Sequence, residues 1–114
     1  MKISQAEKLK LALETMLDTK GVVGFKIARN LRMINDELQE YYQFKQELFK
    51  KYGELKDGFY SIEKGTPAFD EFMKEFTPLA EQEINFDFRM LKEDELVDSG
   101  LSAGQMAQIW EIVE

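Results

Sequence analysis

The chain has 114 residues, of which 44% are hydrophobic, and this is enough for one domain with a core. The absence of His and Cys removes the commonest general base, the usual neutral metal ligand and any disulfide or thiolate chemistry. The net charge of −7 is unevenly spread. Residues 1–52 carry ten Lys or Arg against seven Asp or Glu, whereas residues 53–114 carry five against fifteen. This disfavours nucleic acid as a partner, because the second half would repel phosphates, and it suits either a basic protein partner or solubility alone.

The sequence predicts neither a leader nor a membrane anchor. Residue 1 begins a polar, capped helix rather than a basic and then apolar leader, so we expect no secretion. The apolar runs are only two or three residues long, far below the roughly 20 residues of a membrane span.

The first predicted helix begins near Ser4. Ser4 and Glu7 have the spacing of a capping box, and the helix should end near Lys20, with Gly21 in the left-handed conformation after it. One apolar face is predicted for Leu9, Leu13, Met16 and Leu17.

A second, much longer helix is predicted from Gly24 to Tyr52. Its heptad-like face consists of Ile27, Leu31, Ile34, Leu38, Tyr41, Lys45, Leu48 and Tyr52. At 1.5 Å per residue an uninterrupted helix of this kind is about 43 Å long, so it must span the molecule or project from it. The short connection at residues 21–24 predicts that the two helices form an antiparallel hairpin.

The distal part of the long helix is too far away for the first helix to cover. It is rich in aromatic residues, namely Tyr41, Tyr42, Phe44, Phe49 and Tyr52, so either the second half of the chain or another subunit should cover it. We favour cover from within the chain. Lys45 on this face could fix the register of packing or extend its charge to solvent.

The second half of the chain predicts a small α+β layer. Asp57-Gly58 is typical of a turn, Phe59–Ile62 of a short strand, and Thr66-Pro67 of a helix start. Pro78 should kink or end that helix. The alternation from Glu83 to Met90 predicts a half-buried strand, and the sequence leaves open whether it pairs with the first strand and in which direction.

A last helix is predicted to begin at Ser102, which has Gln105 at the position of a capping partner. Its apolar stripe consists of Met106, Ile109, Trp110 and Val113, and we expect Trp110 to anchor it on the core. The fold class is therefore mainly α with a small β element. Residues 1–114 should form one domain, with a helical hairpin at 1–53 and a small α+β cap at 54–114.

Charged clusters are the other candidate sites. The acidic residues Glu93, Asp94, Glu95 and Asp98 could bind Ca²⁺ or Mg²⁺, but their spacing is not that of an EF-hand, and we favour a solvated connector. Lys20, Lys26, Arg29 and Arg32 could contact an anion or a nucleic acid, but we favour a solvated helix face docked on acids of the second half. There is no phosphate-loop sequence, and no His is present to activate a Ser.

The order of the elements resembles a family of small phage and prophage proteins of Gram-positive bacteria that is described only as a domain of unknown function. The resemblance lies in Phe25–Leu31, Lys50–Gly53, Asp57–Tyr60, the helix at Phe69–Leu79, the strand at Glu83–Phe88 and the helix at Leu101–Val113. It implies a phage context, and therefore the bacterial cytoplasm or a virion, and it supplies no catalytic residues.

We therefore expect a non-enzymatic interaction or assembly protein that binds a protein partner or a second copy of itself. The predicted contact residues are Tyr41, Tyr42, Lys45, Phe49, Tyr52, Glu93, Asp94, Glu95 and Asp98. The alternative is an acidic inhibitor that mimics nucleic acid and blocks a host defence or regulatory protein, which would require carboxylates along one continuous face. An enzyme that uses carboxylates and a transient metal ion ranks third, and no metal, cofactor, membrane or small-molecule substrate is predicted.

Overall fold

The computed structural model describes residues 1–114 as an elongated, mainly helical molecule. The helices are α1 (Ile3–Glu14), α2 (Gly21–Glu37), α3 (Gln39–Tyr52), α4 (Pro67–Ala80), α5 (Glu93–Leu96) and α6 (Ala103–Gln108), followed by a 3-10 turn at Trp110–Ile112. Strands β1 (Glu54–Lys56) and β2 (Phe59–Ser61) form one antiparallel pair. The predicted class, mainly α with a small β element, is confirmed.

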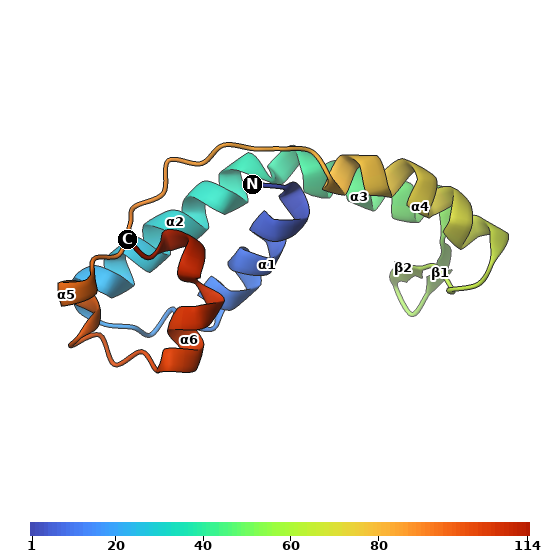
Figure 1. Cartoon of the computed structure of the whole chain (residues 1–114). Coiled ribbons are helices and arrows are strands. Elements are labelled where there is room, and N and C mark those ends of the chain that lie inside the picture. The colour runs from blue at the N-terminus through green and yellow to red at the C-terminus, as the bar shows by residue number, and fades with distance from the viewer.

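The molecule has two lobes joined by one long helical rod (Figure 1). Its extents are 51 × 30 × 22 Å, and its radius of gyration of 17.1 Å exceeds the value of about 13 Å expected for a compact chain of this length. In the first lobe α1 packs antiparallel to α2, and the C-terminal residues with α5 and α6 lie against them. In the second lobe α4 packs along α3, and the β-hairpin projects at its end.

The predicted uninterrupted helix is wrong in its detail. The rod begins at Gly21, not Gly24, and is divided at the buried Leu38, where φ is −91° and ψ is 4°. Hydrogen bonds from Leu38 N to Ile34 O and from Tyr42 N to Leu38 O continue the helical hydrogen-bond pattern across Leu38. The sequence has no Pro or Gly near Leu38, so local propensity does not explain the change. Leu38 lies between α2, which packs on α1, and α3, which packs on α4.

The predicted start of the first helix is also wrong. The helix begins at Ile3 with Lys2 as its N-cap, and Gln5 Oε1 accepts a hydrogen bond from Lys2 N at 2.8 Å. Ser4 lies exposed inside the first turn because Ile3 is drawn into the core, where it is 5% exposed. The helix ends at Glu14, earlier than predicted, while Gly21 does take the predicted left-handed conformation with φ +72°.

The strand predicted at Glu83–Met90 is wrong, although its alternation is informative. The segment is extended but makes no sheet, and only the isolated bridges Lys2–Glu83 and Leu91–Val113 lie at its two ends. Ile84, Phe86 and Phe88 are half-buried against the helical core, so a helical surface takes the place of a neighbouring strand. Strand β2 instead pairs with β1 through the Asp57-Gly58 turn, which answers the question of pairing.

The helix predicted after Thr66 is confirmed at its start. The Thr66 hydroxyl accepts a hydrogen bond from Phe69 N at 3.2 Å, and Pro67 occupies the first turn. Pro78 lies inside α4, which continues for two more residues and ends at Ala80. Phe72 of α4 is 5% exposed and lies between Phe49 and Phe76, with ring centroids 5.0 and 5.2 Å away.

The main core fills the first lobe and continues along the rod. It consists of Ile3, Ala6, Leu9, Leu13, Met16, Val23, Ile27, Leu31, Ile34, Leu38, Tyr41, Leu91, Leu96, Ile109 and Ile112. Segment 84–114 therefore closes the N-terminal hairpin, whereas 54–80 packs on the far half of the rod.

Candidate functional site

An apolar groove lies at the end of the first lobe. The Ser102 hydroxyl accepts a hydrogen bond from Gln105 N at 3.1 Å, and Gln105 Oε1 accepts one from Ser102 N at 2.8 Å, so the predicted capping box of α6 is confirmed. The groove, which we call the terminal groove, has a volume of about 450 Å³. It is lined by Glu93, Leu96, Val97, Leu101, Met106, Trp110, Val113 and Glu114.

Trp110 is the most prominent side chain of this groove, and its predicted role as a core anchor is wrong. Helix α6 ends at Gln108, and the 3-10 turn that follows buries Ile109 and Ile112 completely. Because Trp110 directly follows Ile109, it cannot share that buried face, and it is 67% exposed. The apolar pair at positions 109 and 112 was the sequence signal for this arrangement.

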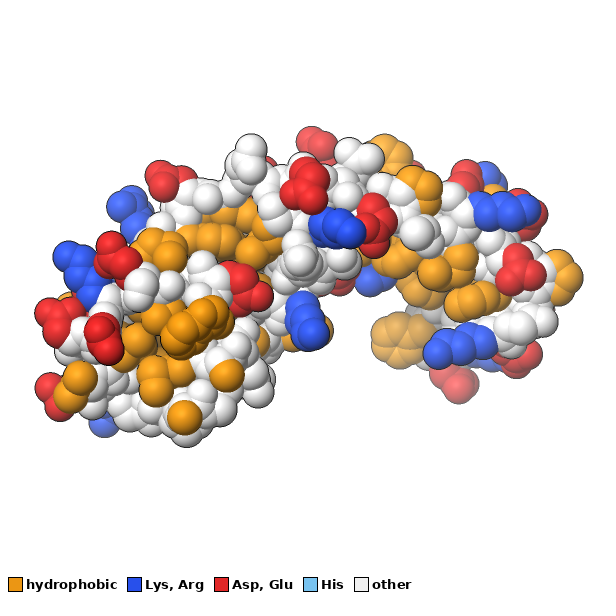
Figure 2. All heavy atoms as spheres, in the orientation of Figure 1, with side chains coloured by type: hydrophobic (Ala, Val, Ile, Leu, Met, Phe, Trp, Pro, Cys, Tyr) orange, Lys and Arg blue, Asp and Glu red, His pale blue; other side chains and the backbone are white.

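The lining of the groove consists of six hydrophobic residues and two glutamates. Val97, like Trp110, is largely exposed, at 76%, and the two acidic lining residues, Glu93 and Glu114, are exposed as well. Figure 2 shows apolar side chains gathered over the lobe that contains α5 and α6, with acidic side chains around them. Exposed aromatic and aliphatic side chains inside a charged rim are typical of protein-binding surfaces.

A second apolar surface lies at the opposite end of the molecule, on the β-hairpin. Phe59 is 77% exposed, Leu55 62% and Tyr60 40%, and Leu55 pairs directly across the hairpin with Tyr60. We call these three residues the hairpin surface. A cavity of about 380 Å³ joins it to α3 and is lined by Gln46, Phe49, Lys50, Gly58, Phe59 and Tyr60. A two-stranded hairpin is marginal in water unless something packs on it, and all six strand residues of this one are exposed.

The aromatic residues predicted to bind a partner are covered by both α1 and α4: the Tyr42 hydroxyl accepts a hydrogen bond from Lys10 Nζ of α1 at 3.2 Å, and Phe49 packs on Phe72 of α4. The first helix therefore reaches further along the rod than predicted. Tyr41 is buried, and Tyr42, Phe49 and Tyr52 are half-buried. Tyr52 and then Lys51 lower the pKa of Glu75 on α4, and the Lys51 Nζ–Glu75 Oε1 distance is 3.3 Å. The expectation that the chain itself covers this part of the rod is therefore confirmed for these four residues, but not for Phe44, which is 57% exposed. Phe49 alone of the four also borders the hairpin cavity.

Lys45 takes part in a polar contact between α1 and α3. The Tyr41 hydroxyl donates to Glu7 Oε1, and Lys45 Nζ lies 3.5 Å from Glu7 Oε2. Burial, and then the bond to Glu7, raise the pKa of Tyr41 above its ordinary value. Of the two roles considered for Lys45, the contact with Glu7 supports the one that fixes helix register.

The predicted acidic residues separate into two groups. Glu95 is docked on α2, where its Oε1 lies 2.8 Å from Lys26 Nζ, and Lys26 also donates to Met90 O at 2.9 Å. Glu93, Asp94 and Asp98 are exposed. This confirms that one cation of the basic helix start docks on acids of the second half. Nowhere do three carboxylates converge as ligands of one metal ion.

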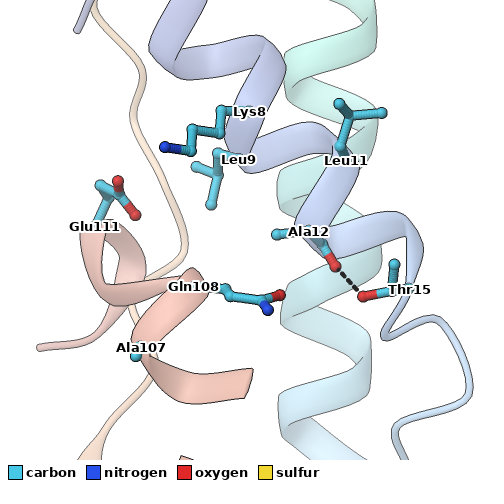
Figure 3. A pocket seen from close by; sticks show the side chains of 8 residues that line it. All are labelled: Lys8, Leu9, Leu11, Ala12, Thr15, Ala107, Gln108 and Glu111. Carbon is cyan, nitrogen blue, oxygen red and sulfur yellow. Dashed lines mark hydrogen bonds between the residues drawn. The ribbon is translucent and has the colours of Figure 1, made fainter. Parts of the chain in front are cut away.

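The largest cavity, of about 620 Å³, is an open groove between α1 and α6 (Figure 3). Lys8 extends from α1 on the side of Glu111, with Leu9, Ala12 and Gln108 between the helices. The Thr15 hydroxyl donates to Ala12 O at 2.6 Å, so it is held by the backbone rather than presented as a nucleophile. The groove thus offers one lysine and one carboxylate on separate walls, without a paired acid and base.

No helix combines the length and the apolar character that a membrane span requires. Comparison of the chain with protein-family models, with curated proteins and with solved structures gives no match.

Proposed function

We propose that the protein is a non-enzymatic interaction or assembly protein that joins protein partners at its two ends. The observation that carries this proposal is the pair of exposed apolar surfaces, the terminal groove and the hairpin surface, at opposite ends of a molecule 51 Å long. A rod with two separate contact surfaces is suited to hold two partners apart at a fixed distance.

The terminal groove fits an amphipathic basic segment of a partner protein. Trp110 and Val97 supply the kind of exposed apolar contact that dominates binding energy when it is buried at the centre of an interface. Glu93 and Glu114 in the lining favour Lys or Arg next to the apolar anchors of the partner. A partner that covers Phe59 and Leu55 would stabilise the hairpin, because binding would remove the apolar area of both side chains from water.

A phage or prophage setting, in the bacterial cytoplasm or a virion, rests on the sequence resemblance alone. Of the two functions considered from the sequence, assembly is better supported than mimicry of nucleic acid. A mimic needs carboxylates in a continuous row, whereas on the face in Figure 2 they are interspersed with basic and apolar side chains.

A peptide-library selection on the immobilised protein tests the terminal groove. Peptides that bind the native chain but not the Trp110→Ala variant should carry apolar anchors with flanking Lys or Arg. Because Trp110 is the only tryptophan, its emission should shift to the blue as such a peptide buries it. Leu17→Ala is the matched control, since Leu17 is 56% exposed and lies in neither surface.

Three results would contradict the proposal: peptides that bind Trp110→Ala as well as the native chain, peptides without basic residues, or emission unchanged by binding. Light scattering provides a further check. A native oligomer that Trp110→Ala dissociates would show that the occupant of the groove is a second copy of the chain.

A further inference from the structure

All three arginines of the chain meet at one place beside α2. Arg29, Arg32 and Arg89 line a shallow cavity of about 380 Å³, together with Met33 and Asp36. Arg29 and Arg32 are three positions apart on the helix, so they share one face. Arg89 comes from the extended segment between α4 and α5, and the tertiary fold alone brings it here.

Asn30 fixes the position of Arg89. The Asn30 side chain is fully buried, the only polar side chain in the chain that is, and it binds the backbone of Arg89 on both sides. Asn30 Nδ2 donates to Arg89 O at 2.9 Å, and Arg89 N donates to Asn30 Oδ1 at 2.8 Å. The Cα atom of Arg89 is therefore held next to the turn of α2 that carries the other two arginines.

These three guanidinium groups have no carboxylate partner. Every ion pair in the structure uses a lysine or the amino terminus as its cation, and none uses an arginine. Lys26, one turn earlier on α2, is paired with Glu95. Asp36 is the single acid in the lining of the cavity. Gathered like charges destabilise the fold, and a bound anion would relieve their repulsion.

The residue type and a neighbouring ring point to the ligand. A guanidinium group presents a planar fork of donors that matches the oxygens of a phosphate, which a lysine cannot do. The Arg29 guanidinium carbon lies 5.7 Å from the centre of the Phe25 ring, a cation–π contact that restricts this side chain. Phe25 is 64% exposed, so its ring is accessible to a flat group on a ligand.

We propose that Arg29, Arg32 and Arg89 form a binding site for a phosphate group, either free or as part of a nucleotide. The net charge of −7 and the small size of the cavity favour such a small ligand over a nucleic acid. The site lies on the outer side of α2, and none of its residues lines the terminal groove or belongs to the hairpin surface, so it does not depend on the function proposed above.

An NMR titration of the full chain with inorganic phosphate, and separately with ADP, tests the site. The chain has three arginines, so its Arg Nε–H region should hold three signals, and all three should shift with one saturating curve. Added NaCl should weaken the binding. If the ligand is a nucleotide, ADP binds more tightly than phosphate, and Phe25→Leu removes that difference; if it is the phosphate group alone, the two bind alike.

Matched variants separate the site from general charge. Arg29→Gln, Arg32→Gln and Arg89→Gln should each weaken binding about tenfold. Lys64→Gln removes the same charge from an exposed, unpaired residue in the other lobe and should change binding less than about twofold. Equal shifts with chloride at matched ionic strength, or unchanged binding by the three Arg variants, would overturn the proposal. If a single-stranded oligonucleotide binds much more tightly than ADP, the ligand of the site is a nucleic acid and the proposal of a small ligand is wrong.

Discussion

Replacing Asn30 by Ala should destabilise the fold more than any exposed Asn to Ala change on the same helix. The side chain is fully buried and makes two hydrogen bonds, of 2.9 and 2.8 Å, to the backbone of Arg89. Together with the bond from Lys26 Nζ to Met90 O, those bonds link α2 to the extended segment that closes the first lobe. Their loss leaves a backbone N–H and a C=O of Arg89 without protein partners.

The size of the effect follows from these two bonds. Each contributes about 1 kcal/mol net, so their loss costs about 2 kcal/mol. Ala has a better helix propensity than Asn by about 0.5 kcal/mol, which leaves a destabilisation of about 1.5 kcal/mol for Asn30→Ala. Asn35 is exposed on α2, so Asn35→Ala keeps only the propensity gain. The two variants should therefore differ by about 2 kcal/mol.

Urea unfolding followed by circular dichroism measures this difference. With a slope of about 2 kcal/mol per molar urea, the midpoints of the two variants should lie about 1 M apart. Hydrogen exchange of the Arg89 amide should also accelerate in Asn30→Ala and stay slow in Asn35→Ala. Midpoints that coincide within error, or an Arg89 amide that is unprotected in the native chain, would refute the reasoning.

Three further changes have defined outcomes. A Cβ atom at Gly24 would lie 1.8 Å from Thr19 O, so Gly24→Ala should lower the free energy of unfolding in urea by about 3 kcal/mol. A Cβ atom at Gly104 would have no atom nearer than 3.9 Å, so Gly104→Ala should be neutral or stabilising. Equal effects of the two changes would contradict this reasoning. Because burial raises the pKa of Tyr41, the folded state keeps its phenol proton longer than the unfolded state. The resulting stability is present below about pH 10 and is lost above it, so Tyr41→Phe should flatten the decline in unfolding free energy there, and an unchanged slope would count against it. Phe72→Ala should lower the free energy of unfolding, measured by thermal unfolding, by about 4 kcal/mol, because the ring is 5% exposed and lies between two other rings. A loss below about 1 kcal/mol would show that these ring contacts do not hold α4 on α3.

Much of the fold could be predicted from local patterns. The helical period of residues 24–52, the cap at Thr66 and the capping box at Ser102 each depend on neighbours in the chain, and the structure contains all three features. The alternation at residues 84–88 also predicted which side chains turn inward. It could not tell whether a strand or a helix covers them, because both surfaces accept an alternating face.

The candidate sites were much less predictable. Trp110 was expected inside because an apolar residue at a helical position is usually buried, but a six-residue helix and the turn after it rotate the indole outward. The strand that contains Leu55 leaves no sequence pattern, since β1 is only three residues long and all three are exposed. Arg89 could not be assigned to the same site as Arg29, because a hydrogen-bonded contact across the chain places it there.

The helical rod, its aromatic distal half and the caps that begin α4 and α6 can all be derived from the amino-acid sequence, since they depend on period and on residues a few positions apart. Three features follow only from the way the elements pack: α4 lies along that half, residues 84–114 return to the first lobe, and apolar side chains stay exposed at both ends. The physical reason is that burial depends on which surfaces meet, and a chain with several amphipathic segments has more than one way to pair them.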